Sequence, residues 1–171
     1  MFRSDIERWV REDPCQIPEV WVSSYGGSGS NLLVDWVQRF RRARTHLYDL
    51  SLCHWWEPLD LGVPRLLILG HPVLAYRSME RRKMLFLNAY KASGYRASPA
   101  FAMLTHLRNW RDEPCVKYEH LWEHLPEVCG YLRVPHEGFP ERQPRLSEPH
   151  PLPGMEELVE LYDSFPNVRI P

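Results

Sequence analysis

Two short apolar runs most constrain what this chain can fold into. "EVWVSS" (19–24) and "RLLILG" (65–70) are too short for helices and rich in strand-forming residues, which predicts two buried strands. The second run is almost wholly apolar, as is typical of parallel strands covered on both faces. Two further strands are predicted at "LYDLSLC" (47–53) and "CVKY" (115–118).

Helical segments alternate with these strands. An apolar face recurs at helical spacing after the first strand, carried by Leu32, Leu33, Trp36, Val37 and Phe40. Further helices are predicted from Pro72 to about Lys91, after Ser98-Pro99, on both sides of Pro126, and over 154–165. The alternation predicts a single α/β domain over residues 1–171, with a parallel sheet and helices on both faces. Six prolines fall in the 21 residues from 134 to 154, which predicts an extended arm.

The composition excludes several classes of protein. Twenty-one basic side chains balance 22 acidic ones, so no general field attracts nucleic acid or a membrane. No apolar run approaches the ~18 residues of a membrane span, and the N-terminus has no signal-peptide core. The four cysteines lack CxxC spacing and are interpreted as reduced, mostly buried thiols. We therefore expect a cytoplasmic protein without nucleic-acid or membrane partners.

A glycine-serine loop joins the first strand to the first long helix. Gly26, Gly27 and Gly29 can take positive φ angles, and the candidate donors are Ser28, Ser30 and Asn31. Backbone N–H groups at the start of a helix attract anions, so the loop is a candidate phosphate site rather than only a tight turn. It lacks the lysine of GxxxxGK[ST], which argues against an ordinary ATP or GTP site.

Four stretches, taken together and in this order, resemble the sulfotransferase family. "SYGGSGSNLLVDWV" resembles the loop that binds the 5′-phosphosulfate, and "LSLCHWW" has the flanks of the strand that ends in the family's catalytic histidine. "LLILGHPVLAYRS" resembles the 3′-phosphate element, in which a serine lies six residues past a proline, here Ser78 and Pro72. "VKYEHLWEHLPEVCGYLRVP" resembles a late conserved segment.

The resemblance implies a three-layer, P-loop-type fold and sulfuryl transfer from 3′-phosphoadenosine 5′-phosphosulfate to a hydroxyl or amine, without a metal. It places His54 as the general base, which would deprotonate a small-molecule or sugar acceptor. Nucleotide binding is expected at residues 26–31 and near Ser78. Three family cations are replaced, by Gly27, Leu52 and Gly70.

Other cations are candidates for the missing charge. Arg77 and Arg81 share one helix face, and the remaining candidates are Arg82, Arg142, Arg145 and a partner copy in a homo-oligomer. Each candidate also has a purely structural explanation. The two arginines would form a solvated helix face, and Ser78 would be an ordinary helical residue. His54 would pack against tryptophans, and the loop's polar residues would cap the helix. His120 and His124 have metal-ligand spacing but no third ligand, so no metal site is predicted.

The alternative function is a catalytically degenerate domain of the same fold that binds a nucleotide, an anion or a protein partner. A kinase-like phosphotransferase is disfavoured, because neither a loop lysine nor a metal-binding acid follows a strand.

Overall fold

The structure is a computed structural model. It describes residues 8, 12, 18–26, 28–43, 46–47, 50–51, 56–83, 98–142 and 149–171. His54, Gly27, Cys15, Cys53 and Arg145 lie outside this set, as do most of the segment 4–12 and all of the segment 84–97.

Four strands form an open sheet in the order β1 (Trp21–Ser23), β4 (Arg65–Leu69), β5 (Cys115–Lys117) and β6 (Val168–Arg169). The first three strands run parallel, and β6 pairs antiparallel with β5. In this register Leu67 of β4 lies between Ser23 and Cys115. The three predicted strands at these positions are confirmed.

Side chains alternate between the two faces of the sheet, and both faces are buried. Trp21, Leu67, Leu69 and Cys115 enter the core on one face. Val22, Leu66, Ile68 and Val116 enter the core on the other. This double burial explains the continuous apolar sequence of β4, since a strand exposed on one face would alternate with polar residues.

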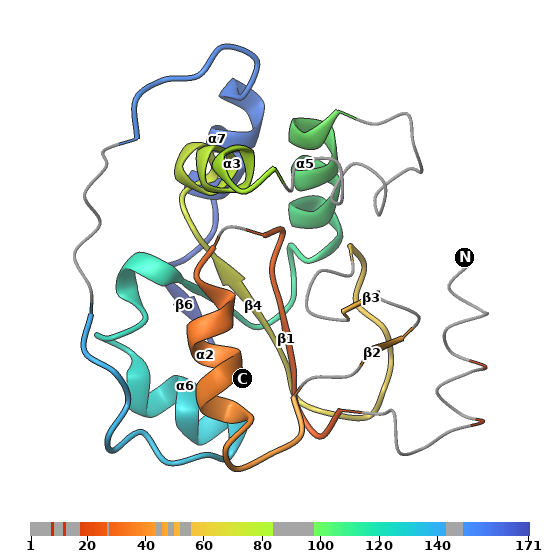
Figure 1. The fold of residues 1–171 in the computed structure, drawn as a ribbon, viewed down its shortest axis with the longest axis vertical. Helices are drawn as coiled ribbons and strands as arrows, with labels where there is room; N and C mark the ends of the chain where they lie inside the picture. Colours follow the sequence, from red (N-terminus) through yellow and green to blue (C-terminus); the bar gives the residue numbers. More distant parts are fainter. Residues whose placement is uncertain are drawn as a thin grey trace.

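Helices cover each face. α2 (Ser30–Val37) and α6 (Leu125–Leu132) pack on one face, and α3 (Pro72–Arg81), α5 (Pro99–Asn109) and α7 (Glu156–Asp163) pack on the other (Figure 1). The predicted α/β architecture, a mostly parallel sheet with helices on both faces, is confirmed.

Local signals in the sequence explain where several helices begin. Ser98 caps α5 through a 3.2 Å hydrogen bond that its Oγ accepts from the backbone N–H of Phe101. Pro72 and Pro126 lie in the first turns of α3 and α6, where a missing N–H costs nothing. Between β5 and α6 the chain makes a 3₁₀ turn, η3 (Tyr118–His120).

Two sequence predictions are wrong. Residues 47–53 were expected to form a strand of the main sheet, but β2 (His46–Leu47) and β3 (Leu50–Ser51) pair with each other as a two-stranded antiparallel sheet. The helix expected up to Lys91 ends at Arg81, followed by a left-handed Lys83 with φ 54°.

The proline-rich arm is held to the domain by two indole groups. Trp36 Nε1 donates to the carbonyl of Pro135 at 2.8 Å, and Trp122 Nε1 donates to that of Pro140 at 2.9 Å. Residues 135–142 and 149–154 contain no helix or strand, as expected for an extended arm. Among the helices that the structure describes, none has the length and apolar character needed to cross a membrane.

Candidate functional site

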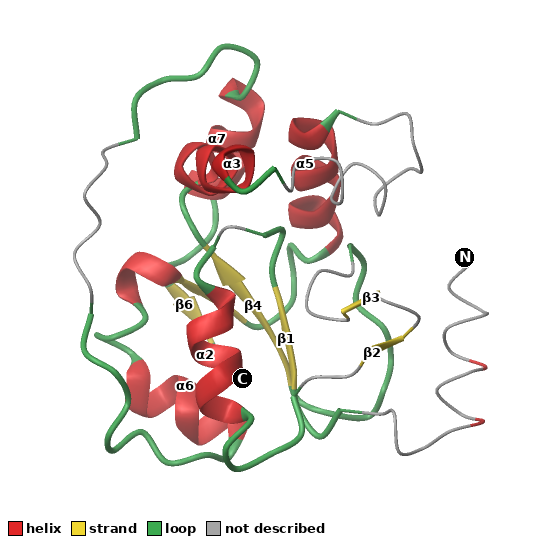
Figure 2. Cartoon of the chain, viewed as in Figure 1, coloured by secondary structure: helices red, strands yellow, loops and turns green. Residues whose placement is uncertain are grey.

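The carboxyl ends of β1, β4 and β5 meet at one edge of the sheet, and each continues into a polar segment. β1 leads into Ser24–Ser30, β4 into Gly70-His71, and β5 into Tyr118-Glu119. Figure 2 shows β1 and β4 side by side in the sheet, with loops joining them to the helices. The helices after β1 and β4 pack on opposite faces of the sheet. Ligands of open α/β sheets bind at such switch points, beyond the carboxyl ends of the strands.

Three contacts join these segments pairwise. The hydroxyl of Tyr25 donates to the carbonyl of Gly70, which ties the ends of β1 and β4. The N–H of His71 donates to Glu119 Oε1 at 3.3 Å, which ties β4 to β5.

The third contact links the loop after β1 to the end of β5. The ring of Tyr118 lies against Gly29, so closely that a Cβ on residue 29 would stand 2.9 Å from Cζ of the ring. The three segments therefore form one connected edge although they lie far apart in the sequence.

Serine hydroxyls stabilise the glycine-serine loop from within. Ser24 Oγ donates to Ser30 Oγ at 2.9 Å and accepts from the N–H of Gly26 at 3.3 Å. Ser28 Oγ donates to the carbonyl of Gly26 at 3.2 Å, and Ser28 is fully buried. Ser28 and Ser30 thus hold the loop in shape, and Asn31 alone of the three predicted side-chain donors is exposed.

The start of α2 leaves backbone donors available for a ligand. Its N-cap is Gly29, in the left-handed conformation with φ 77°, and no side chain caps the helix, so the expectation of capping by Ser28, Ser30 or Asn31 is wrong. The backbone N–H groups of residues 28–31 donate to no group that the structure describes. Ser28 and Ser30 are buried, so Gly29 and Asn31 are the residues of this turn with exposed surface. Their N–H groups lie at the positive end of the helix dipole, which favours an anion.

Below the loop, His106 of α5 supports the end of β1. Its Nε2 lies 3.2 Å from Ser23 Oγ, and its ring stacks on Trp110 at a centroid distance of 5.9 Å. The ring of Tyr25 meets His106 edge-on. These buried contacts fix the direction in which the chain leaves β1.

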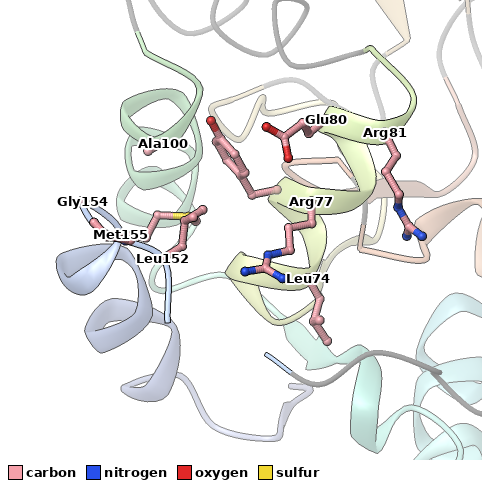
Figure 3. A pocket seen from close by; sticks show the side chains of 10 residues that line it. Leu74, Arg77, Glu80, Arg81, Ala100, Leu152, Gly154 and Met155 are labelled. Atoms are coloured by element: carbon pink, nitrogen blue, oxygen red, sulfur yellow. The ribbon is translucent and has the colours of Figure 1, made fainter. Parts of the chain in front are cut away.

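The structure places the predicted helix cations elsewhere. Arg77 and Arg81 of α3 line a cavity together with residues 152–155, and no residue of the glycine-serine loop lines it (Figure 3). Ser78 is half-buried on the same helix. Arg82 donates its Nε to the carbonyl of Ser78 in its own helix at 3.2 Å. The described part of the chain contains no contact between these side chains and the loop.

A cation that the sequence reasoning passed over lies at the carboxyl edge. Lys117, the last residue of β5, is only 9% exposed, and its Nζ stands 4.6 Å from the ring centroid of Tyr162 on α7. Tyr162 donates its hydroxyl to Glu119 Oε2 at 3.0 Å, and its ring lies 5.4 Å from that of His71. The position of this charge was predictable from the sequence, because a lysine that ends an otherwise buried strand places its ammonium group near the strand's carboxyl end.

The other candidate groups have structural partners. His120 Nδ1 lies 2.8 Å from Glu123 and His124 Nδ1 lies 3.2 Å from Glu127, and the hydrogen bond to His120 lowers the pKa of Glu123. In the described ranges, no three His, Cys, Asp or Glu side chains gather as metal ligands. The guanidinium of Arg142 lies over the Trp122 ring at 6.0 Å.

Two of the four cysteines, Cys115 and Cys129, are free and buried, as expected.

Comparison of the chain with protein-family models, with curated proteins and with solved structures finds no match.

Proposed function

We propose that this chain is a sulfotransferase-like domain that binds 3′-phosphoadenosine 5′-phosphosulfate at residues 26–31 and transfers its sulfuryl group to a hydroxyl or amine. One observation carries the proposal. Three stretches that resemble the family separately in the sequence meet at one sheet edge, through Tyr25 with Gly70, Gly29 with Tyr118, and His71 with Glu119.

The phosphosulfate would be held mainly by backbone groups. The N–H groups of Gly29 and Asn31 lie at the positive end of α2, where an anionic oxygen gains hydrogen bonds and a favourable dipole. Asn31 is the exposed side chain in this turn and adds an amide donor. Fixed donors of this kind stabilise the charge that develops on the leaving phosphate without reorganising.

Lys117 is the best-placed described cation for the charge that the loop itself lacks. It ends β5, the strand whose next residue, Tyr118, touches Gly29 of the loop. Its stem is buried, and its ammonium group contacts the face of Tyr162 and no carboxylate among the described residues. A bound phosphate would give this charge an anionic partner.

His54 is the proposed general base and lies outside the described residues. As the acceptor oxygen or nitrogen forms its bond to sulfur, a neutral imidazole would take the acceptor's proton. The bond between sulfur and the bridging phosphate oxygen breaks in the same transfer, which leaves adenosine 3′,5′-bisphosphate.

A second candidate is a domain that binds the nucleotide without catalysis. It is favoured by the replacement of three family cations, at residues 27, 52 and 70. It is favoured also by the burial of Ser28 and Ser30, whose hydroxyls already have partners inside the loop.

Calorimetric titration with adenosine 3′,5′-bisphosphate, beside ATP, tests the proposal. We expect micromolar binding that is selective over ATP and lost in the Ser28→Ala/Ser30→Ala variant. Ser164→Ala is the matched control, because that serine is exposed and bonds only to its own helix carbonyl, that of Leu161. Absence of binding at millimolar ligand would exclude an autonomous nucleotide site.

A transfer assay then separates the two candidates. Formation of a sulfated acceptor that stops in His54→Ala supports the enzyme. Nucleotide binding with no transfer to any phenol, sugar or amine in an acceptor screen supports the binding domain instead.

A further inference from the structure

A cavity of about 580 Å³ lies between three elements that are distant in the sequence. It is bounded by α3, by the first turn of α5 at Ala100, and by residues 152–155 just before α7 (Figure 3). Its volume falls within the roughly 300–1,000 Å³ of small-molecule sites.

Apolar side chains form part of the wall of this cavity. Leu74 comes from α3, and Leu152 and Met155 come from the opposite side. Each is buried or half-buried. Such walls favour an apolar or aromatic ligand body, because covering them removes apolar surface from water.

Charged side chains from one turn of α3 face this apolar space. Figure 3 shows Arg77 and Glu80 on the side of α3 that faces Leu152 and Met155, whereas Arg81 extends in the other direction. Within the described part of the chain, neither Arg77 nor Glu80 forms a side-chain hydrogen bond or an ion pair. Arg77 is half-buried, and a partly buried guanidinium is stabilised by an anionic partner.

We propose that this cavity binds an organic anion with an apolar body, whose acidic group pairs with Arg77 while the body covers Leu152 and Met155. The guanidinium fork suits a carboxylate, sulfonate or sulfate, which it can bind through two parallel hydrogen bonds. This inference does not rest on the proposed sulfuryl transfer, since the glycine-serine loop contributes no residue to the cavity. It assigns Arg77 to a site separate from that loop.

Two dyes that differ only by an acidic group serve as probes. 1-Anilinonaphthalene-8-sulfonate carries a sulfonate, and N-phenyl-1-naphthylamine has the same aromatic body without it. Fluorescence titration of the full chain with each dye separates the charge from the apolar contact. We expect Arg77→Gln to weaken binding of the sulfonate about tenfold and to leave the neutral dye unchanged.

A variant of Glu80, on the same helix, should change binding of the sulfonate dye in the opposite direction. Removing its negative charge in Glu80→Gln should strengthen binding of the sulfonate severalfold, because the anion is then no longer repelled. Arg82→Gln is the matched control, since Arg82 lies outside the cavity and bonds to its own helix. Neither dye should respond to that control.

Ala100→Trp tests the cavity independently of charge. The larger side chain fills the space from α5 and should abolish binding of both dyes, while circular dichroism confirms an intact fold. Adenosine 3′,5′-bisphosphate should not displace the sulfonate dye. The proposal is overturned if Arg77→Gln weakens both dyes equally, if Ala100→Trp weakens neither, or if the nucleotide competes.

Discussion

The ring of Tyr118 lies against the backbone of Gly29 and so fixes the start of α2 on the end of β5. The contact needs a glycine for two separate reasons. Residue 29 has φ 77°, which L side chains rarely adopt, and a Cβ there would overlap with the tyrosine ring. The shape of the loop therefore depends on β5 as well as on its own glycines.

We expect Gly29→Ala to lower the free energy of unfolding and to abolish nucleotide binding. The positive φ costs about 1–2 kcal/mol in any non-glycine residue, and displacement of the Tyr118 ring adds about 1–3 kcal/mol. Chemical denaturation measures the free energy of unfolding, and calorimetric titration measures nucleotide binding.

Gly154→Ala is the matched control for backbone strain alone. Gly154 has φ 81°, and no atom lies within 4 Å of a Cβ built there. If both variants lower the free energy of unfolding by the same amount, the contact between Tyr118 and Gly29 contributes nothing to stability.

Tyr25→Phe should weaken both stability and nucleotide binding. It removes the hydroxyl that reaches the carbonyl of Gly70, and the buried carbonyl loses that donor at a cost of about 1–3 kcal/mol. Tyr131→Phe makes the same change at the amino end of β4, where the hydroxyl of Tyr131 donates to the carbonyl of Arg65 at 3.1 Å. It should destabilise the protein without affecting nucleotide binding, and equal effects on binding would contradict a site at the carboxyl edge.

Lys117→Met separates charge from packing at the same edge. The methionine keeps the buried stem but loses the cation over Tyr162, so stability should change by no more than about 2 kcal/mol. Affinity for adenosine 3′,5′-bisphosphate should fall by roughly tenfold or more, with a weaker dependence on salt. Arg82→Met removes an exposed cation as the control. Unchanged affinity in Lys117→Met would place the phosphate away from β5.

The buried thiol of Cys129 should make stability fall at high pH. Burial, and to a smaller degree the charge of Glu137, raises its pKa from 9.0 to about 11 in the folded protein. Below pH 9 the thiol is protonated in both states and contributes no pH dependence. Between pH 9 and 11 the unfolded chain loses the proton first, so unfolding becomes easier by on the order of 1–2 kcal/mol. Thermal melts of Cys129→Ala should show a shallower decline over this range, and parallel curves would contradict the assignment.

The fold was predictable where local sequence decides it. β4 is apolar at consecutive positions because both its faces are covered, and Ser98-Pro99 sets the start of α5. β6 was not predictable, since its two residues are half-exposed and acquire strand geometry only by pairing with β5. The hairpin of β2 and β3 likewise depends on which partner its short strands meet.

The sequence predicted at which end of the sheet the glycine-serine loop lies, but not which side chains surround it. The loop follows a strand in the sequence, which places it at the carboxyl end of the sheet. The contacts by which Tyr118 and Glu119 tie this end of β5 to its neighbours were not part of that prediction. Helical spacing could not reveal that Arg77 faces residues 152–155, because that contact depends on how the arm returns to α7. The role of Ser28 and Ser30 inside the loop is equally a tertiary property.

The hydrogen bond from Tyr162 to Glu119 has a consequence for biosynthesis. α7 and β6 are the last elements described along the chain, yet Tyr162 of α7 reaches the same edge as the glycine-serine loop. Domains assemble from the N-terminus as the ribosome makes them. β1, β4 and β5 can pair before residues 156–169 have left the exit tunnel, but Lys117 and Glu119 then lack the tyrosine that covers them. A nascent chain stalled before this point should hold nucleotide more weakly than the released protein.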